Sequence, residues 1–511
     1  MLRSNEENYA IELNQITKKF GNVVANDNIN LKIKHGEILA LLGENGSGKT
    51  TLMNMLSGIY YPDEGSITIA GKVASIGSPK DAIDYGIGMI HQHFKLVEVF
   101  NAMDNIVAGT KGKYEKPKKL KEKIMNLSAK FGLEIDPDKK IYNMSVSEKQ
   151  TVEIMKVLYR GAQILILDEP TAVLTPQETE KLFKILRKMK EQGSAIIIIT
   201  HKLHEVLSIS DKVAILRKGK LIDTVVTSQT NESELTELMV GRPVDLKIER
   251  PEVTQKKTIL KVVDLSVESE DKTLALKDVS FKLKTGEILG VAGIAGSGQK
   301  ELCEAIAGLI EVKRGAILCN KENIIGKSPD EIINLGISMS FVPEDRLGMG
   351  LVGSMGMVEN VMLKSYKKNK GFYIDKSPSR KLSEKLIEKL DIVTQNVDMP
   401  VRMMSGGNVQ KVLLGREIES NPNVLITAYP VRGLDINSSY LIYDLLNEQK
   451  KKGVAILFIG EDLDVLLELS DKIMVLCHGE VQGIVDAKNT TKEEIGLMMT
   501  GMSLKGAEQD E

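Results

Sequence analysis

The sequence predicts an α/β protein that consists of two tandem copies of one domain. The segment Gly36–Leu39 recurs as Gly286–Leu289, 250 residues later, and Ser210–Lys212 recurs as Ser470–Lys472, 260 residues later. In both copies an apolar run typical of a buried parallel strand precedes a glycine-rich turn and a stretch with helical periodicity. A repeat of this length indicates tandem domains rather than a solenoid.

The two offsets differ because the second copy carries ten extra residues in the region 340–355. The domains are placed at residues 1–244 and 258–503, with a linker at 245–257 and a tail at 504–511. Proline and charged residues in the linker favour this boundary, since such residues are common in the segments that join domains.

The elements of the first copy follow in order along the chain. Residues 38–42 form an apolar run that predicts a buried strand, and residues 164–167 and 195–199 predict two more. After the glycine-rich turn, apolar residues recur at i, i+3, i+4 and i+7, which predicts one face of a helix: Leu52, Met55, Leu56 and Ile59. The more polar region 100–160 predicts a helical subdomain.

The composition excludes several classes of protein. The 68 basic and 70 acidic residues nearly cancel, which gives no support to a nucleic-acid coat or a polybasic membrane binder. The three cysteines are far apart, which argues against a disulfide framework or a structural zinc site. No apolar run approaches the roughly 18–20 residues that span a bilayer. The lysine-rich stretch 111–123 is interpreted as a solvated face rather than a nucleic-acid or lipid patch.

A glycine-rich turn of fixed spacing lies between the first apolar strand and the helix. It runs through Gly43, Glu44, Asn45, Gly46, Ser47, Gly48, Lys49 and Thr50, a complete G-x-x-x-x-G-K-[ST] motif, and Thr51 follows it. Such glycines let backbone N–H groups turn inward around phosphate oxygens, and the helix N-terminus adds positive potential. We expect Lys49 to contact the β- and γ-phosphates of ATP and Thr50 to offer its hydroxyl to Mg²⁺.

Two carboxylates follow the predicted strand at 164–167. We expect Asp168 to hold Mg²⁺ through water and Glu169 to polarise the attacking water as general base. The alternative is an ordinary pair of carboxylates at the end of a strand. That alternative is disfavoured because Pro170 and Thr171 follow directly and the phosphate loop lies upstream.

Lys49 together with Asp168, Glu169 and Pro170 resembles the ABC ATPase family, over about residues 10–502. The resemblance implies that each copy has a RecA-like α/β core with an antiparallel β region and a helical subdomain. It also implies ATP and Mg²⁺ as cofactors.

The resemblance implies roles for three further residues of the first copy. Gln92 contacts Mg²⁺ and senses the membrane partner, His201 contacts the γ-phosphate, and Phe20 stacks on adenine. His91 and His93 alone would suggest a metal pair, but the sequence offers no third ligand. The implied catalytic residues are therefore Lys49, Gln92, Glu169 and His201. The implied metal-binding residues are Thr50, Gln92 and Asp168.

The second copy keeps the scaffold but changes its chemistry. Gln299 stands where the phosphate-binding lysine belongs, Ala428 and Tyr429 replace the two carboxylates, and Glu461 replaces the histidine. Lys300, Glu344 and Glu270 occupy the Mg²⁺-hydroxyl, glutamine and aromatic positions. By the resemblance this copy is expected to bind nucleotide poorly and to hydrolyse it very poorly, since extra carboxylates repel a triphosphate.

The family's signature motif is preserved only in the second copy. There it includes Ser405, Gly406 and Gly407, whereas the first copy has Val146 and Ser147 in place of the glycines. Asp435, in the loop after Ala428 and Tyr429, also matches the residue that the family has at this position. Because two domains of this family associate head to tail, the resemblance implies one complete ATP site that adds these residues of the second copy to those of the first. Every defect then falls in the other site.

Two copies, one of them degraded, resemble the ATPase subunit of a bacterial simple-sugar or nucleoside importer, and the segments 91–97, 159–162 and 170–178 favour the nucleoside branch. The resemblance implies two multispanning membrane permeases, a substrate-binding lipoprotein, a peripheral location on the cytoplasmic face of the membrane, and either a homodimer or two copies per transporter. A ribose- or galactose-type sugar importer is the alternative. A soluble tandem ABC ATPase acting on ribosomes is disfavoured by the short linker and the degraded site, and no nucleic-acid partner is expected.

Overall fold

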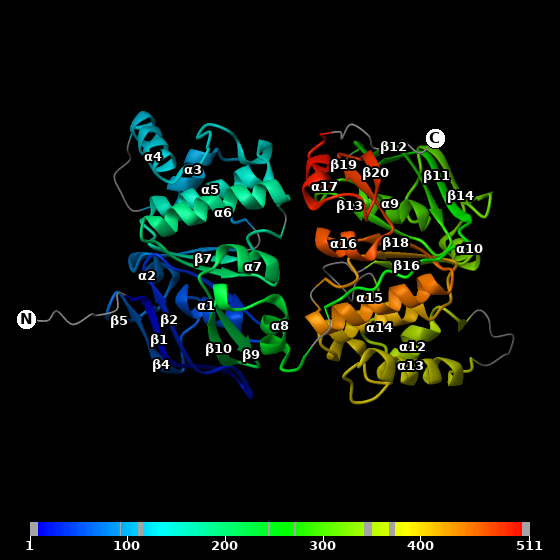
Figure 1. The fold of residues 1–511 in the computed structure, drawn as a ribbon, viewed down its shortest axis with the longest axis horizontal. Helices are drawn as coiled ribbons and strands as arrows, with labels where there is room; N and C mark the ends of the chain where they lie inside the picture. Colours follow the sequence, from blue (N-terminus) through cyan, green and yellow to red (C-terminus); the bar gives the residue numbers. More distant parts are fainter. Residues whose placement is uncertain are drawn as a thin grey trace, which may run out of the picture. The chain divides into compact units, whose positions relative to one another are not determined.

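The computed structural model of the protein describes residues 9–91, 94–110, 116–172, 174–243, 246–269, 272–341, 350–366, 374–432 and 434–502. The chain separates into two compact units, Met1–Asp245 (unit 1) and Leu246–Glu511 (unit 2). Both units are α/β, which confirms the predicted fold class (Figure 1). Four residues singled out in the sequence lie outside the described residues, namely Gln92, His93, Glu270 and Glu344.

Within its described residues, unit 1 contains a six-stranded sheet in the order β10-β9-β3-β8-β7-β6 and a four-stranded sheet in the order β2-β1-β4-β5. The strands are β1 (Tyr9–Phe20), β2 (Val23–Lys34), β3 (Ile38–Leu42), β4 (Glu64–Ile69), β5 (Lys72–Ala74), β6 (Ile87–Ile90), β7 (Ile164–Asp168), β8 (Ala195–Ile199), β9 (Lys212–Arg217) and β10 (Lys220–Val226). The helices are α1 (Lys49–Leu56), α2 (Pro79–Asp84), α3 (Ala102–Val107), α4 (Pro117–Phe131), α5 (Val146–Tyr159), α6 (Pro176–Glu191), α7 (Leu203–Ile209) and α8 (Glu232–Val240).

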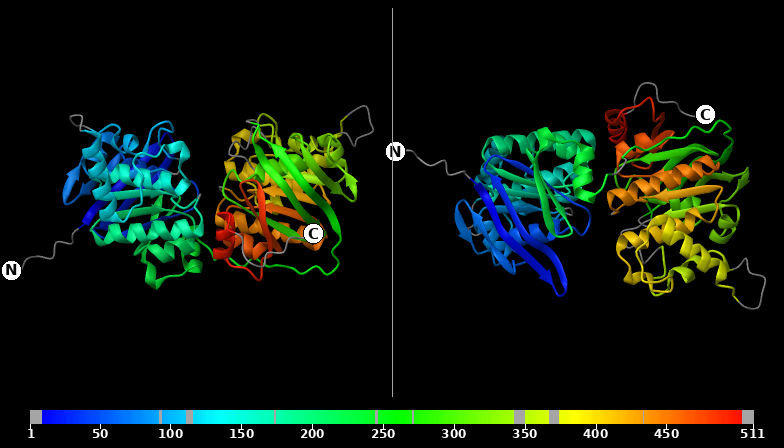
Figure 2. Two further views of the ribbon diagram at one scale, coloured as in Figure 1. Left: turned by 90° about the horizontal axis from the view of Figure 1, so that it is seen from above. Right: turned by 60° about the horizontal axis from the view of Figure 1, so that its bottom comes forward.

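The apolar strands of the larger sheet are buried on both faces. β3 pairs in parallel with β8 and β9, and β7 pairs in parallel with β6 and β8. Alternate residues of β7 enter two different cores: Ile166 packs with α1 and the four-stranded antiparallel sheet, and Leu167 packs with α5 and α6. Figure 2 shows the long β1–β2 hairpin of this antiparallel sheet. A strand covered on both faces reads as a continuous apolar run, which is why the sequence revealed these strands.

The first helix is shorter than the periodicity predicts. α1 ends at Leu56, and Gly58 follows with a left-handed φ of 76°. A glycine in this conformation is a common helix terminator. Ile59, expected on the helix face, therefore lies beyond the helix and is 46% exposed. The polar region does form helices, α3 to α5, beside the core.

Unit 2 repeats this architecture within its described residues, with sheets in the orders β12-β11-β14-β15 and β16-β17-β18-β13-β19-β20. The strands are β11 (Thr258–Glu268), β12 (Leu274–Lys284), β13 (Ile288–Ala292), β14 (Arg314–Cys319), β15 (Glu322–Asn323), β16 (Ile337–Phe341), β17 (Val424–Ala428), β18 (Ala455–Ile459), β19 (Lys472–Cys477) and β20 (Glu480–Asp486). The helices are α9 (Gln299–Ile306), α10 (Pro329–Asn334), α12 (Met357–Met362), α13 (Ser377–Leu390), α14 (Gly406–Ile418), α15 (Ile436–Lys451), α16 (Leu463–Leu469) and α17 (Lys492–Met499).

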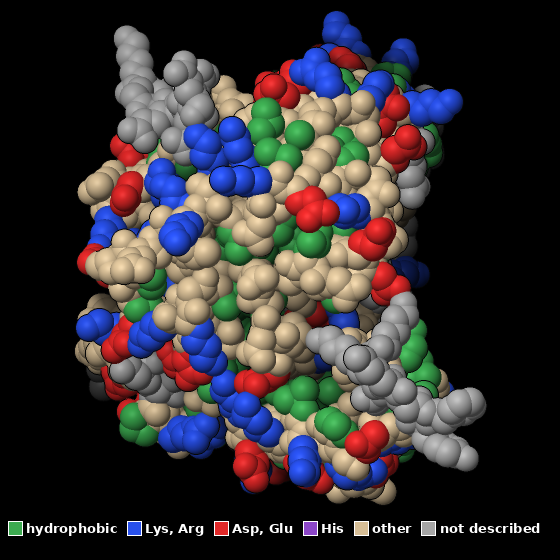
Figure 3. Space-filling view, turned by 90° about the vertical axis from the view of Figure 1, so that its right-hand side faces the viewer, with side chains coloured by type: hydrophobic (Ala, Val, Ile, Leu, Met, Phe, Trp, Pro, Cys, Tyr) green, Lys and Arg blue, Asp and Glu red, His purple; other side chains and the backbone are tan. Residues whose placement is uncertain are grey.

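The surface of the protein carries charges of both signs. Lys, Arg, Asp and Glu side chains intermingle on the face shown in Figure 3. Ion pairs among the described residues of unit 2 include Arg380 with Asp398 and Lys385 with Glu419. In the part of the chain that the structure describes, no helix is both long and apolar enough to cross a membrane.

Candidate active site

The glycine-rich loop between β3 and α1 has a backbone that only glycine fits. Gly43 and Gly48 have φ angles of 154° and 100°. A Cβ on Gly43 would lie 2.3 Å from the carbonyl oxygen of Leu216, and a Cβ on Gly48 would lie 2.3 Å from that of Ala25. Buried Asn26 donates to the carbonyl of Gly48 at 3.2 Å. The loop is thus packed tightly against β2 and β9, while its tip at Asn45 and Gly46 is exposed.

The loop has polar groups that no described protein group satisfies. No side chain caps the N-terminus of α1, so the positive end of the helix dipole is left for a ligand. The Ser47 hydroxyl is buried and has no hydrogen-bond partner among the described residues. Leaving such a group unsatisfied costs about 1–3 kcal/mol, a cost that an anion bound in the loop would remove.

Lys49 is the first residue of α1, and its side chain folds back over the loop. Its Nζ donates to the carbonyl oxygens of Gly43 at 2.6 Å and of Glu44 at 3.0 Å. Burial lowers the pKa of Lys49, and the negative charges of Glu169, Asp168 and Glu44 oppose that shift. The ammonium is therefore hydrogen bonded to the loop, and the nearby carboxylates favour its charged form. Thr50 and Thr51 follow it on α1, with Thr50 exposed.

The structure brings the two carboxylates and the histidine together, because β7 and β8 are neighbouring parallel strands. The Nδ1 of His201 lies 3.0 Å from the Oε1 of Glu169. The other carboxylate oxygen of Glu169, Oε2, is buried without a hydrogen-bond partner among the described residues. Burial and the neighbouring Glu169 raise the pKa of Asp168, while His91 and Lys49 oppose the shift. One oxygen of Glu169 is thus in contact with His201, and the other is buried without a described partner.

Glu169 has an unusual backbone conformation. Its φ of 49° lies in the left-handed region, which costs a residue with a side chain on the order of 1 kcal/mol or more. Its N–H donates to the carbonyl of Ile199 at 2.9 Å, which fixes the turn against β8. Strain of this kind is commonly found at functional sites.

Phe20 forms an exposed aromatic surface at the end of β1. Its side chain is 43% exposed, and Tyr60 contacts its ring edge-to-face with the centroids 5.2 Å apart. Lys18 lies 5.5 Å from the same ring centroid. Phe20 pairs with Val23 at the start of β2, the strand that contacts the glycine-rich loop. Neither Tyr60 nor Lys18 was found from the sequence, since a single tyrosine or lysine carries no motif.

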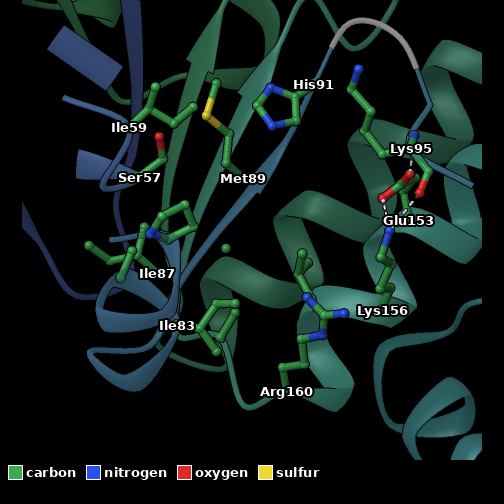
Figure 4. Close-up of a pocket in the computed structure, with 15 residues that line it drawn as sticks. Ser57, Ile59, Ile83, Ile87, Met89, His91, Lys95, Glu153, Lys156 and Arg160 are labelled. Atoms are coloured by element: carbon green, nitrogen blue, oxygen red, sulfur yellow. Dashed lines mark hydrogen bonds and ion pairs between the residues drawn. The ribbon is translucent and has the colours of Figure 1, made fainter. Parts of the chain in front are cut away.

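A cavity of about 230 Å³ lies next to His91 in unit 1. Figure 4 shows apolar Ile59, Ile87 and Met89 on one side of it and a charged group on the other. In that charged group, Glu153 accepts from the backbone N–H of Lys95 at 2.6 Å, and Lys156 donates to the carbonyl of Lys95 at 2.8 Å. No sequence motif predicts this cavity, because its lining comes from the segment after α1, from α2, β6 and α5, and from loops beside them.

The signature segments of the two units differ at their helix N-termini. In unit 2, exposed Ser405 caps α14, and a Cβ on Gly407 would make only an ordinary contact of 3.5 Å, so packing inside unit 2 does not require that glycine. In unit 1, the Glu148 carboxylate accepts the N–H of Ser145 at 2.8 Å and completes a capping box on α5. The N-terminus of α5 is thus capped by a carboxylate that also forms an ion pair with Lys139 at 2.7 Å, whereas α14 has no acidic residue in its first turn.

Asp435 has a structural partner. It caps α15 by accepting the N–H and the hydroxyl of Ser438 at 2.8 and 2.7 Å. Its predicted contact with nucleotide stays a prediction.

The loop of unit 2 keeps its shape without the lysine. Gly298 has a φ of 102°, and buried Gln299 donates to the carbonyl of Ile294 at 3.3 Å, as Lys49 does to Glu44. Burial and the charge of Glu461 raise the pKa of Tyr429 to about 12, so its phenol stays neutral. Glu461 forms an ion pair with Arg432 at 3.5 Å.

Gln299→Ala is expected to leave ATP turnover within about twofold of the wild type, because the Gln299 amide is neutral and carries no charge with which to stabilise the phosphates. Steady-state hydrolysis by the purified chain measures this. A loss as large as that of Lys49→Ala would show that the second loop also takes part in hydrolysis.

Comparison with known proteins agrees with this geometry. The family profile described as ABC transporter matches residues 26–172 and 276–430, one match in each unit. The chain belongs to the ABC transporter family. The ABC transporter matches cover both glycine-rich loops and extend through the strand ends at Asp168 and Ala428, so the predicted family is confirmed.

Several ABC transporter relatives align over almost the whole chain. The nucleoside import ATP-binding protein NupA of Lactococcus lactis subsp. cremoris is 43% identical over 96% of this chain and 98% of its own length. The guanosine import ATP-binding protein NupO of Bacillus subtilis is 42% identical over 98% of this chain and 99% of its own length. The ribose import ATP-binding protein RbsA of Clostridium tetani is 37% identical over 96% of this chain and 97% of its own length.

Proposed function

We propose that this chain is the ATP-hydrolysing subunit of an importer that carries nucleosides through partner membrane permeases. As an ABC transporter ATPase it binds ATP and couples ATP hydrolysis to transport. The observation that favours nucleosides is the higher identity to the nucleoside and guanosine import proteins, 43% and 42%, than to the ribose and galactose import proteins, 37% and 35%. A simple-sugar importer is the second candidate, supported by those same sugar relatives.

The hydrolytic chemistry is proposed to reside in unit 1. The phosphates of ATP would lie in the hollow of the glycine-rich loop, where backbone N–H groups, Lys49 and the Ser47 hydroxyl can contact them. Glu169 would accept a proton from the attacking water through its free oxygen Oε2, while His201 fixes the other oxygen. Phe20 would stack on the adenine ring.

The residues near Lys49 fit a magnesium ion. The Thr50 hydroxyl and the Asp168 carboxylate are oxygen donors of the kind Mg²⁺ prefers, and it commonly takes its other ligands from phosphates and water. No group of three or more acidic, His or Cys side chains forms a metal cluster among the described residues, which is compatible with such a site. When bound, Mg²⁺ supplies charge neutralisation for the phosphates. Gln92 is proposed as a further ligand.

Ser405, Gly406, Gly407 and Asp435 are proposed to contact the same nucleotide. The family resemblance suggests this arrangement, and the glycine-rich start of α14, which has no acidic residue in its first turn, supports it, since a backbone without side chains can approach a phosphate closely. At the equivalent end of α5, Val146 and Ser147 carry side chains where α14 has glycines, and the Glu148 carboxylate already accepts the N–H of Ser145.

The partners are proposed to be two multispanning permeases and a substrate-binding lipoprotein, with this chain on the cytoplasmic face of the membrane. We propose the cavity beside His91 as the surface that a permease contacts. It follows the segment of Gln92, and it combines an apolar wall with the cations Lys95, Lys156 and Arg160. Such a surface suits a short amphipathic segment with an acidic residue.

Lys95→Glu is expected to weaken permease binding about tenfold while leaving the basal ATPase activity unchanged, because it reverses a rim charge. Co-purification of tagged chain with its membrane partners measures this, and Lys119→Glu on α4, far along the chain from the cavity lining, is the matched control. Equal recovery of permeases by both variants would show that permeases do not contact the cavity.

A pull-down from native membranes with mass spectrometry tests the function itself. Two permeases and a lipoprotein are the expected partners, and binding assays on the lipoprotein with nucleosides, ribose and galactose then choose between the two candidates. Recovery of ribosomal proteins without a permease would overturn the importer proposal.

A further inference from the structure

A buried polar group lies directly behind the Glu169–His201 contact. Glu205 on α7 is only 4% exposed, and Thr171 only 1%. The Thr171 hydroxyl donates to Glu205 Oε2 at 2.6 Å, and Lys202 Nζ lies 3.2 Å from Glu205 Oε1. Lys202 also donates to the carbonyl of Thr171 at 3.2 Å. These three residues form a closed set of contacts, which we call the Glu205 triad.

The Glu205 triad joins the two loops that carry the proposed catalytic pair. Thr171 lies two residues after Glu169, and Lys202 directly follows His201. The N–H of Lys202 further donates to the hydroxyl of Thr200 at 3.1 Å, which holds the start of the second loop. Each loop is therefore tied to the same carboxylate, so a shift of one loop relative to the other must break a buried hydrogen bond.

Unit 2 provides an internal comparison. At the equivalent positions, 260 residues later, it has Val431, Val465 and Asp462. The two valines pack with the apolar core of unit 2, and Asp462 caps α16 instead. In that unit the catalytic pair itself is replaced by Tyr429 and Glu461. The same backbone thus forms with an apolar pair at these positions.

The comparison indicates that folding does not require the Glu205 triad. A buried carboxylate is unfavourable unless it is paired, and apolar residues of similar size commonly serve stability equally well. The polar residues Thr171 and Glu205 occur in the unit that has the Glu169–His201 contact. We infer that Glu205 is a positioning residue that, through Thr171 and Lys202, holds Glu169 and His201 in register for hydrolysis. This inference rests on the proposed roles of Glu169 and His201.

The test uses the purified full chain and substitutions taken from unit 2. The double variant Thr171→Val/Glu205→Val reproduces the apolar pair of unit 2, and Thr171→Ser keeps the hydroxyl and serves as the conservative control. We expect the double variant to keep the wild-type melting temperature and ATP affinity within about twofold while kcat falls about tenfold or more. Thr171→Ser is expected to keep kcat within about twofold of the wild type.

The inference is overturned if the double variant retains the wild-type kcat, or if kcat falls only in proportion to ATP affinity and melting temperature. The single variant Thr171→Val gives a second readout should the double variant fold poorly, since it must also lower kcat without weakening ATP binding. Glu169→Gln, assayed in parallel, separates a failure of this inference from a failure of the proposed function. If Glu169→Gln abolishes turnover and the double variant does not lower kcat, only the role of Glu205 fails. If Glu169→Gln is itself active, the proposed role of Glu169 as the base fails, and the premise of this inference fails with it.

Discussion

Glu169→Gln is expected to lower ATP turnover about 100-fold or more while ATP still binds. The substitution keeps the shape of the side chain and an oxygen that can accept a hydrogen bond from His201, 3.0 Å away in the wild type. It removes the basic oxygen Oε2, which is buried without a described partner, and a positioned general base typically contributes a factor of this size. Steady-state hydrolysis and equilibrium binding of ATP by the same preparation measure the two quantities.

The matched control for this substitution is Tyr429→Phe, at the equivalent turn of unit 2. Tyr429 shares the left-handed backbone, with a φ of 54°, but its neutral phenol cannot serve as a base at neutral pH. Turnover by Tyr429→Phe is expected to stay within about twofold of the wild type. Substantial residual hydrolysis by Glu169→Gln would transfer the role of the base to another group.

Lys49→Ala is expected to abolish ATP turnover, by about 100-fold or more, and to weaken ATP binding as well. The ammonium lies over the glycine-rich loop, hydrogen bonded to the carbonyls of Gly43 and Glu44, and its charge is proposed to stabilise the transferred phosphoryl group. ATP hydrolysis and binding of a fluorescent ATP analogue measure both effects.

A loss of activity in Lys49→Ala could also come from a collapsed loop, because the alanine removes the two hydrogen bonds. Lys49→Gln separates the explanations. In unit 2 the amide of Gln299 makes the corresponding contact with the carbonyl of Ile294 and holds the loop without a charge. Lys49→Gln should therefore retain the melting temperature of the wild type and still lose turnover. Wild-type turnover by Lys49→Gln would show that turnover depends on the hydrogen bonds to the loop and not on the positive charge of the side chain.

The sequence predicted those parts of the molecule that depend on local patterns. The strand at Ile38–Leu42 and the turn after it were visible because a doubly covered strand is apolar throughout and because close backbone packing at Gly43 and Gly48 excludes other residues. The end of α1 was misjudged, since the apolar period continued to Ile59 while Gly58 terminated the helix.

Interactions between distant segments could not be predicted. Thr171 and Glu205 are separated by 34 residues, and neither belongs to a phosphate-binding motif. Their contact arises only after β7 and β8 have paired and α7 has packed behind them. The same holds for Tyr60 beside Phe20 and for the cavity beside His91, whose lining residues come from several separate elements.

The left-handed turn at Glu169 has a consequence for engineering the protein. Glycine adopts that backbone conformation readily and asparagine tolerates it, so either residue would relieve the strain. A selection for thermal stability alone is therefore expected to favour replacement of Glu169. Such a replacement would raise the melting temperature and remove the proposed catalytic base. Thermostabilised forms of this chain should be sought with position 169 held fixed.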